Sequence, residues 1–253
     1  MWKVNWNLSR APAEFVERMR KEERIQKDRQ GNDVRWLCPS HPRNFKLELE
    51  SMLEVVRKYD VDGVHFDYIR YPNSSACYCS GCKERFEKNR GVEIKNWPEE
   101  VISGAYSEDF ARWRREQITR LVQAVSEQAR KINPDIKVSA AVFRDYPRCR
   151  QSVGQDWKKW IDSGYLDFVC PMDYTADNEQ FGNLVISQKE VVNRVIPFYP
   201  GIGASAPGLP PEQVAMQMYI ARNLGADGLI IFNYGLSVAT EVLPALSKGI
   251  TSE

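Results

Sequence analysis

The chain has 253 residues, of which 43% are hydrophobic and 27% are charged. This composition is typical of a folded globular domain with one sizeable core, and it predicts a single domain over residues 1–253. Thirty-five Lys and Arg balance 34 Asp and Glu, so the net charge is only +1 and no strong field favours nucleic acid or an anionic membrane as a partner. We therefore expect a neutral ligand.

The amino terminus carries no targeting signal. No apolar segment approaches the roughly 20 residues that a membrane-spanning helix requires, and the first ten residues contain no signal-peptide core. Trp2, Val4 and Trp6 alternate with polar residues as in a strand already in progress. This pattern predicts that the natural domain begins upstream of Met1, so the amino terminus does not indicate localisation. The sequence does not indicate the oligomeric state.

The hydrophobic pattern predicts strands that alternate with helices. The highly charged residues 14–30 are expected to form an exposed helix or a mobile excursion. Helices are then expected at 43–59, 108–132, 156–164, 188–195 and 211–225. Strands are expected at 2–6, 64–66, 137–143, 165–174, 196–204 and 226–235.

This alternation predicts an α/β fold with an all-parallel sheet, either a doubly wound sheet or a (β/α)8 barrel of the TIM type. No strand is followed by a GxGxxG turn, and polar residues recur at strand ends, which favours the barrel. The count of six strands falls short of eight. We therefore expect an incomplete barrel whose first two strand-helix units lie upstream of Met1.

The most informative segment is VDGVHFDYIRYP at residues 61–72. Val64 and Phe66 are typical of a short buried strand, and Asp67 follows at its carboxyl end, where the chemistry of such barrels is built. A helix-capping or ion-paired role for Asp67 is the alternative. Glycoside hydrolysis usually needs two carboxyl groups, one as acid and one as nucleophile or base.

Two aspartates at other strand ends are candidate partners for Asp67. Asp173 lies between Met172 and Tyr174, an apolar setting that would raise a carboxyl pKa and suit a general acid, so it is the first choice. Asp145 is the second, because its neighbour Arg144 makes an ion-paired or solvated role equally plausible.

Other polar and aromatic residues at strand ends are expected to line the cleft and bind sugar rings and hydroxyl groups, although simple core packing is the alternative for each tyrosine. They are Asn5, His65, Tyr68, Arg70, Tyr174, Asn233 and Tyr234. No Glu stands at any predicted strand end, which is unusual for a glycosidase. His65 shares a strand face with Asp67, yet a lone buried histidine is more often structural.

Four cysteines have the spacing of a metal site. Cys77, Cys79 and Cys82 form a C-x-C-x2-C pattern within a Cys-rich insertion at about residues 73–104, and Cys38 precedes them in WLCPSHP. Four thiolates are typical of a structural Zn2+ site without an open position for water. Disulfides to Cys38 or Cys149 are the alternative, and His41 is a substitute ligand. Cys170 is expected in the core, and no organic cofactor is expected.

The chain resembles the glycosyl-hydrolase-like family 10 proteins, barrel domains of bacterial and mostly exported polypeptides, over nearly its whole length. The resemblance is carried by WKVNWNL, CPSHPRN, DGVHFDYIRYP, KVSAAVF, LDFVCPMDYT and GADGLIIFNYG. It implies a (β/α)8 glycosidase-like fold, a carbohydrate substrate, a catalytic carboxylate at Asp67 and an extracytoplasmic location. Residues 38–86 also resemble the zinc cluster of glycoside hydrolase family 42 β-galactosidases.

These observations support three hypotheses for function. The first is a glycoside hydrolase that uses Asp67 with Asp173 on a polysaccharide or glycan. The second is a non-catalytic carbohydrate-binding barrel, which the missing strand-end Glu motivates. The third is a zinc-dependent hydrolase, which would need a His or carboxylate ligand and an open metal position.

Overall fold

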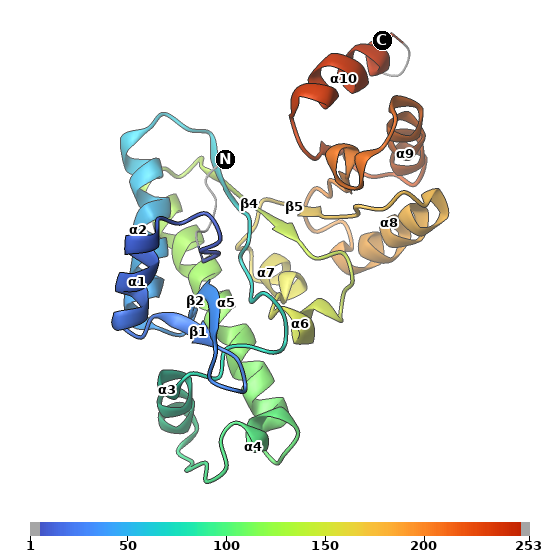
Figure 1. Ribbon diagram of the computed structural model, residues 1–253. Helices are drawn as coiled ribbons and strands as arrows, with labels where there is room; N and C mark the ends of the chain where they lie inside the picture. Colours follow the sequence, from blue (N-terminus) through green and yellow to red (C-terminus); the bar gives the residue numbers. More distant parts are fainter. Residues whose placement is uncertain (1–5, 249–253) are drawn as a thin grey trace. The chain divides into compact units, whose positions relative to one another are not determined.

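The computed structural model describes residues 6–248, and the chain divides into two compact units (Figure 1). The first unit comprises Met1–Val138 with Pro147–Trp160, and the second comprises Ser139–Tyr146 with Ile161–Glu253. Elements of the first unit are α1 (Ala13–Lys21), β1 (Ile25–Lys27), β2 (Asp33–Leu37), α2 (Pro42–Lys58), β3 (Gly63–Phe66), α3 (Ser80–Arg90), α4 (Glu99–Ile102), α5 (Ser107–Ile132) and α6 (Cys149–Ser152). Elements of the second are β5 (Phe168–Pro171), α8 (Asn178–Val192), β6 (Gly201–Ile202), η1 (Ala204–Gly208), α9 (Pro211–Asn223), β7 (Ile230–Ile231), η2 (Val238–Val242) and α10 (Leu243–Leu246). β4 (Lys137–Val142) and α7 (Trp157–Asp162) begin in the first unit and end in the second.

The charged amino-terminal segment folds into more structure than its sequence predicts. After α1, strands β1 and β2 form an antiparallel hairpin, whereas the sequence predicted a helix or excursion and an all-parallel sheet. The turn is stabilised by Asp28, whose Oδ1 accepts hydrogen bonds from the backbone N–H groups of Gln30 and Asn32. Because these strands are very short and Lys, Arg and Asp surround them, the hydrophobic pattern did not reveal them.

The two long helices of the first unit agree with the predicted ones to within about one residue. α2 begins with Pro42, and the His41 ring caps it by accepting a hydrogen bond from the Arg43 backbone N–H. Its apolar face buries Leu49, Met52 and Leu53, and α2 and α5 lie side by side (Figure 1). Burial of this face, rather than intrinsic helix propensity, provides most of the stabilisation of the pair.

Parallel strands carry the polar residues that the sequence places at strand ends. In the first unit, β3 buries Val64 and Phe66, and the Lys137 N–H at the start of β4 donates to the Asp62 carbonyl. In the second unit, β4 pairs in parallel with β5, and β6 pairs in parallel with β7. The prediction of an α/β fold with parallel strands is confirmed, and residues 6–248 form no closed barrel.

The second unit differs from the prediction in the lengths of its elements. α8 begins ten residues before the expected start at 188, because the Asp177 side chain caps it by accepting hydrogen bonds from the Glu179 and Gln180 N–H groups. β6 and β7 are only two residues long, although longer strands were expected. The predicted first strand at 2–6 lies almost wholly outside the described residues. Among the described helices, none is long and apolar enough to cross a membrane.

Candidate functional site

Asp67 lies directly after β3 in the first unit. The buried side chains of Val64 and Phe66 anchor this strand, so the chain emerges from the core at Asp67, which is only partly buried. The Asp67 Oδ1 accepts a hydrogen bond from the backbone N–H of Tyr68 at 2.8 Å, and Tyr68 has a positive φ of 59°. This turn orients the Asp67 carboxylate and directs the Tyr68 ring toward the hairpin.

An aromatic wall of Trp36, Tyr68 and Arg70 stands beside Asp67. The Trp36 and Tyr68 ring centroids are 5.7 Å apart. The Arg70 guanidinium lies 5.1 Å from the Trp36 centroid and 5.0 Å from the Tyr68 centroid, which is cation–π geometry. Trp36 was missed in the sequence because its strand, β2, was not predicted. The wall holds Tyr68 and Arg70 in place next to the carboxylate.

His65 and Asn5 were the other candidates near Asp67. His65 is largely buried, and burial lowers its pKa to about 4, so the imidazole is neutral at pH 7. A neutral imidazole donates and accepts one hydrogen bond each, which suits either a substrate hydroxyl or a structural contact. Asn5 lies outside the described residues.

Asp173 follows β5 in the second unit and is fully buried at 0% exposure. Its Oδ1 accepts a hydrogen bond from Gln188 Nε2 at 2.6 Å, while its buried Oδ2 has no hydrogen-bond partner. Burial raises the pKa of Asp173 to about 8, so the carboxyl group holds a proton at neutral pH. Gln188, on α8, also donates to the Arg144 carbonyl at 3.1 Å.

Asp145 has the opposite setting. Its side chain is 53% exposed, and its Oδ2 lies 4.0 Å from the Nε of Arg144. The Arg144 Nη1 in turn donates to the Tyr174 carbonyl at 3.1 Å. Asp145 is therefore accessible and forms a long ion pair with Arg144. This setting agrees with the alternative prediction of an ion-paired or solvated Asp145.

The remaining predicted cleft residues lie near the ends of β5 and β7. The Tyr174 ring stacks on Phe232 with centroids 5.0 Å apart, so part of its face is used in packing. The Asn233 backbone N–H donates to Ser205 Oγ at 3.0 Å, and Tyr234 is 81% exposed. Asp145, Asp173 and Tyr174 thus gather in the second unit, whereas Asp67, Tyr68 and Arg70 gather in the first.

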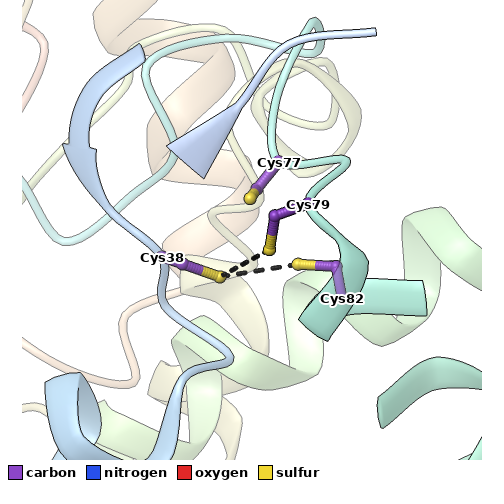
Figure 2. A group of neighbouring side chains, drawn as sticks. All are labelled: Cys38, Cys77, Cys79 and Cys82. Atoms are coloured by element: carbon purple, nitrogen blue, oxygen red, sulfur yellow. Dashed lines mark hydrogen bonds between the residues drawn. The ribbon is translucent and has the colours of Figure 1, made fainter. Parts of the chain in front are cut away.

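The four cysteines form one buried cluster in the first unit (Figure 2). All four Sγ atoms lie within 4.8 Å of one another, and Cys38 Sγ lies 3.5 Å from Cys82 Sγ and 4.0 Å from Cys79 Sγ. Four thiolates at about 2.3 Å from a tetrahedral Zn2+ are roughly 3.8 Å apart, so the spacing fits such an ion. Hydrogen bonds from the Cys77, Cys79 and Cys82 thiols hold the pKa of Cys38 well below its usual range.

Local backbone contacts bring these thiols together. Cys38 follows β2, and its N–H donates to the Arg24 carbonyl at 2.8 Å. The Tyr78 N–H donates to the Lys27 carbonyl at 2.8 Å, which ties the Cys77–Cys79 loop to the hairpin. Cys79 precedes α3, and Cys82 lies in the first turn of that helix.

The disulfide alternative is wrong, because all six cysteines are within the described residues and all are free. Cys149 instead donates from Sγ to the Gln155 carbonyl at 3.3 Å, and Cys170 is buried in β5 as predicted. His41 caps α2 and is not a member of the thiol cluster. A donor set of four sulfur atoms favours a structural ion over the zinc-dependent hydrolase hypothesis.

Parallel strands with carboxylates and aromatic side chains at their ends define an α/β protein related in fold to TIM-barrel glycoside hydrolases. The fold is similar to the PgaB glycoside hydrolase domain of Bordetella bronchiseptica, with a TM-score of 0.70 and 14% identity over 88% of this chain and 68% of that chain. It is also similar to a GH42 β-galactosidase of G. stearothermophilus, with a TM-score of 0.61 and 14% identity over 95% of this chain and 42% of that chain.

The chain belongs to the Glycosyl hydrolase-like 10 family, whose model matches residues 2–220. It is 25% identical to the S-layer-related protein of Niallia circulans over 83% of this chain and 15% of that protein. It is 24% identical to the glycosyl hydrolase YngK of Bacillus subtilis over 77% of this chain and 40% of that protein. The chain thus spans well under half the length of these relatives.

Proposed function

We propose that this chain is part of a glycoside hydrolase that cleaves a polysaccharide or glycan with Asp67 as a catalytic carboxylate. The observation that carries the proposal is the position of Asp67, at the carboxyl end of a buried strand and beside the wall of Trp36, Tyr68 and Arg70. In this setting the carboxylate acts on the anomeric carbon or on water. The Tyr68 ring and the Arg70 guanidinium bind sugar faces and hydroxyls, with His65 and Asn5 as further contacts.

The partner carboxyl group in this proposal is Asp173, with Asp145 as the second choice. The raised pKa of Asp173 supports this role. At a pKa of about 8 the carboxyl group is protonated at neutral pH, as a general acid must be. Asp145 is supported by access, because its side chain is exposed. Tyr174, Asn233 and Tyr234 are proposed to bind substrate near these carboxyl groups.

We also propose that residues 1–253 form a single, partial TIM-type barrel domain. Within the described residues, β7 pairs with β6 alone. Apolar side chains of β7 and of the segment after it are exposed, with Ile230 and Phe232 each at 37% and Leu236 at 82%. An extracytoplasmic location is part of the proposal and is supported by the S-layer-related relative.

The cysteine cluster is proposed to hold a structural Zn2+ with Cys38, Cys77, Cys79 and Cys82 as ligands. The mutual spacing, burial and donor type of the four thiols support this assignment. A bound ion would tie the hairpin to the loop that follows Asp67 and so order one side of the candidate cleft.

Replacement of Asp67 by Asn tests the catalytic role. We expect hydrolysis of a glycan that the wild-type protein cleaves to fall by about 10²–10⁴-fold, because the amide cannot act as base or nucleophile. Binding of the same glycan, measured by calorimetry, should survive. Asp62→Asn, five residues earlier at the strand entrance, is the matched control and should leave turnover unchanged. Equal turnover in wild type and Asp67→Asn would refute the role of Asp67.

The variants Asp173→Asn and Asp145→Asn, assayed beside Asp67→Asn, distinguish the two candidate partners of Asp67. The true acid should lose turnover most with substrates whose leaving groups need protonation, and activity toward an activated aryl glycoside should persist. If neither variant changes the ratio of turnover between the two kinds of substrate, neither residue is the acid.

A non-catalytic carbohydrate-binding barrel is the second candidate function, and one observation favours it. Asp173 is fully buried at 0% exposure, so a bound sugar cannot reach its carboxyl group without a rearrangement. This function predicts glycan binding without turnover, and binding that is unchanged in Asp67→Asn. Measurable hydrolysis by the purified wild-type protein would exclude it.

A further inference from the structure

The four cysteines of the cluster cannot by themselves compensate the negative charge of a bound metal site. A divalent ion with four thiolate ligands carries a net charge of −2. The four thiols are buried, with exposures between 0% and 8%, and burying charge is costly unless hydrogen bonds or opposite charges compensate it. The surroundings of the thiols should therefore contain donors aimed at sulfur.

Arg85 supplies such donors. It lies on α3 one turn after Cys82, and its guanidinium reaches back toward the start of the helix. Its Nη2 lies 4.0 Å from Cys38 Sγ, and its Nε donates to Ser40 Oγ at 3.1 Å. An arginine guanidinium is always charged in proteins and has five N–H donors, so it can compensate negative charge on sulfur.

Ser40 connects Arg85 to two of the sulfur atoms. Its hydroxyl is buried and lies 3.2 Å from Cys38 Sγ and 3.3 Å from Cys82 Sγ. Because Arg85 Nε occupies the hydroxyl as an acceptor, the single Ser40 proton is free to donate to a thiolate. Arg85 and Ser40 thus form a short relay of donors that ends on sulfur.

Gly81 makes room for this arrangement. A Cβ atom at position 81 would lie 2.7 Å from both Nη atoms of Arg85, so any side chain there would displace the guanidinium. The first turn of α3 therefore combines a ligand, Cys82, with a gap that receives the arginine. The close approach of the guanidinium to the helix backbone depends on glycine.

We propose that Arg85 and Ser40 form an outer shell that neutralises part of the charge of a metal tetrathiolate and retains the ion. The inference rests on the proposed metal site. Outer-shell donors of this kind typically change metal affinity by about 10–100-fold. Both shell residues are close in sequence to a ligand, Ser40 to Cys38 and Arg85 to Cys82, so the same loops that bring the thiols together also bring the shell.

The test measures metal binding rather than catalysis. The full chain is purified without metal under reducing conditions, and its Zn2+ affinity is measured by competition with a chromophoric chelator. Co2+ then reports the thiolate ligands through its sulfur-to-metal charge-transfer band. We expect Arg85→Gln and Ser40→Ala each to bind Zn2+ about 10–100-fold more weakly than wild type. Both should release Zn2+ faster to excess chelator.

Gly81→Ala is the sharpest variant, because it leaves Arg85, Ser40 and all four ligands in the sequence. Alanine forms helices better than glycine does. If position 81 served only the stability of α3, Gly81→Ala would leave the stability of the protein equal or higher. The proposal predicts weaker Zn2+ binding and a shifted Co2+ band, since the methyl group displaces the guanidinium. Lys88→Gln removes an exposed charge from the same helix and should bind Zn2+ like wild type.

The outcomes separate the inference from the site on which it rests. If wild type binds neither Zn2+ nor Co2+ through its thiols, the metal site and the outer shell are both refuted. If wild type binds Zn2+, but Arg85→Gln and Gly81→Ala bind it as tightly as Lys88→Gln does, the metal site stands and the outer shell is refuted. Should Arg85→Gln fail to fold, Gly81→Ala and Ser40→Ala decide the question.

Discussion

The two units bury polar groups in opposite ways. In the first, four thiols form one buried cluster beside Ser40 and Arg85, which place donors within reach of the sulfur atoms. In the second, Asp173 has one hydrogen bond from Gln188 and a buried oxygen without a partner. The thiol cluster is suited to a cation, whereas Asp173 avoids a buried charge by holding a proton. The comparison shows that two equally buried groups can avoid an uncompensated charge in different ways, one by binding a cation and the other by binding a proton.

The largest expected effect comes from removal of a thiol. Cys82→Ser should abolish stoichiometric Zn2+ binding and lower the free energy of unfolding by several kcal/mol, because binding at a structural zinc site is also folding free energy, about 10–16 kcal/mol in small peptides. Metal content is measured by atomic emission and stability by urea denaturation. Cys170→Ala, a buried cysteine outside the cluster, is the control. One bound ion per chain in Cys82→Ser would contradict the assignment.

A smaller effect is expected from Arg114, which holds the loop that leads to Cys77. Arg114 is buried on α5, its Nη2 donates to the Asn73 and Ala76 carbonyls, and its guanidinium lies 4.2 Å from the Tyr71 ring centroid. Arg114→Met should cost about 3 kcal/mol of stability, since hydrogen bonds from a charged donor contribute about 1.5–3 kcal/mol each.

Urea denaturation checks this change, and a parallel Zn2+ titration shows whether loss of the loop contacts reaches the thiols. Arg112→Met, an exposed arginine on the same helix, should change stability by less than about 0.5 kcal/mol. Similar losses in the two variants would show that the buried contacts of Arg114 do not matter.

The effect expected from Asp173 depends on pH and is smallest near pH 4. Burial raises its folded pKa to about 8, above the value near 3.9 of an unfolded chain. Between these values the folded state binds the proton and the unfolded state does not. Stability contributed by this group is therefore full below about pH 4 and falls as pH rises toward 8, with a slope of at most about 1.4 kcal/mol per pH unit.

Asp173→Asn should remove this slope, because the amide resembles the protonated acid and does not titrate. Urea denaturation of both proteins at several values between pH 5 and pH 8 gives the comparison. Their difference in free energy of unfolding should shift in favour of the variant as pH rises. A constant difference across this range would mean that Asp173 is ionised in the folded protein and that the burial of its Oδ2 has another compensation.

Local sequence patterns were sufficient for several features. Apolar periodicity predicted the helices at 43–59 and 108–132, since one buried face with a period near 3.6 needs no knowledge of the partner. The run from Val64 to Asp67 predicted a buried strand with a carboxylate at its end. The close spacing of Cys77, Cys79 and Cys82 predicted a cluster of thiols, because residues on one short loop are already near each other.

Contacts between residues distant in sequence were decided only by the tertiary structure. The hairpin that contributes Trp36 consists of strands too short to show a pattern, and the pairing of its backbone groups stabilises it. Gln188 on α8 reaches Asp173 across 15 positions, and Arg85 reaches Ser40 across 45 positions. Local patterns thus identify which residues are buried or reactive, but the long-range hydrogen bonds that set their protonation and charge exist only once the chain has packed.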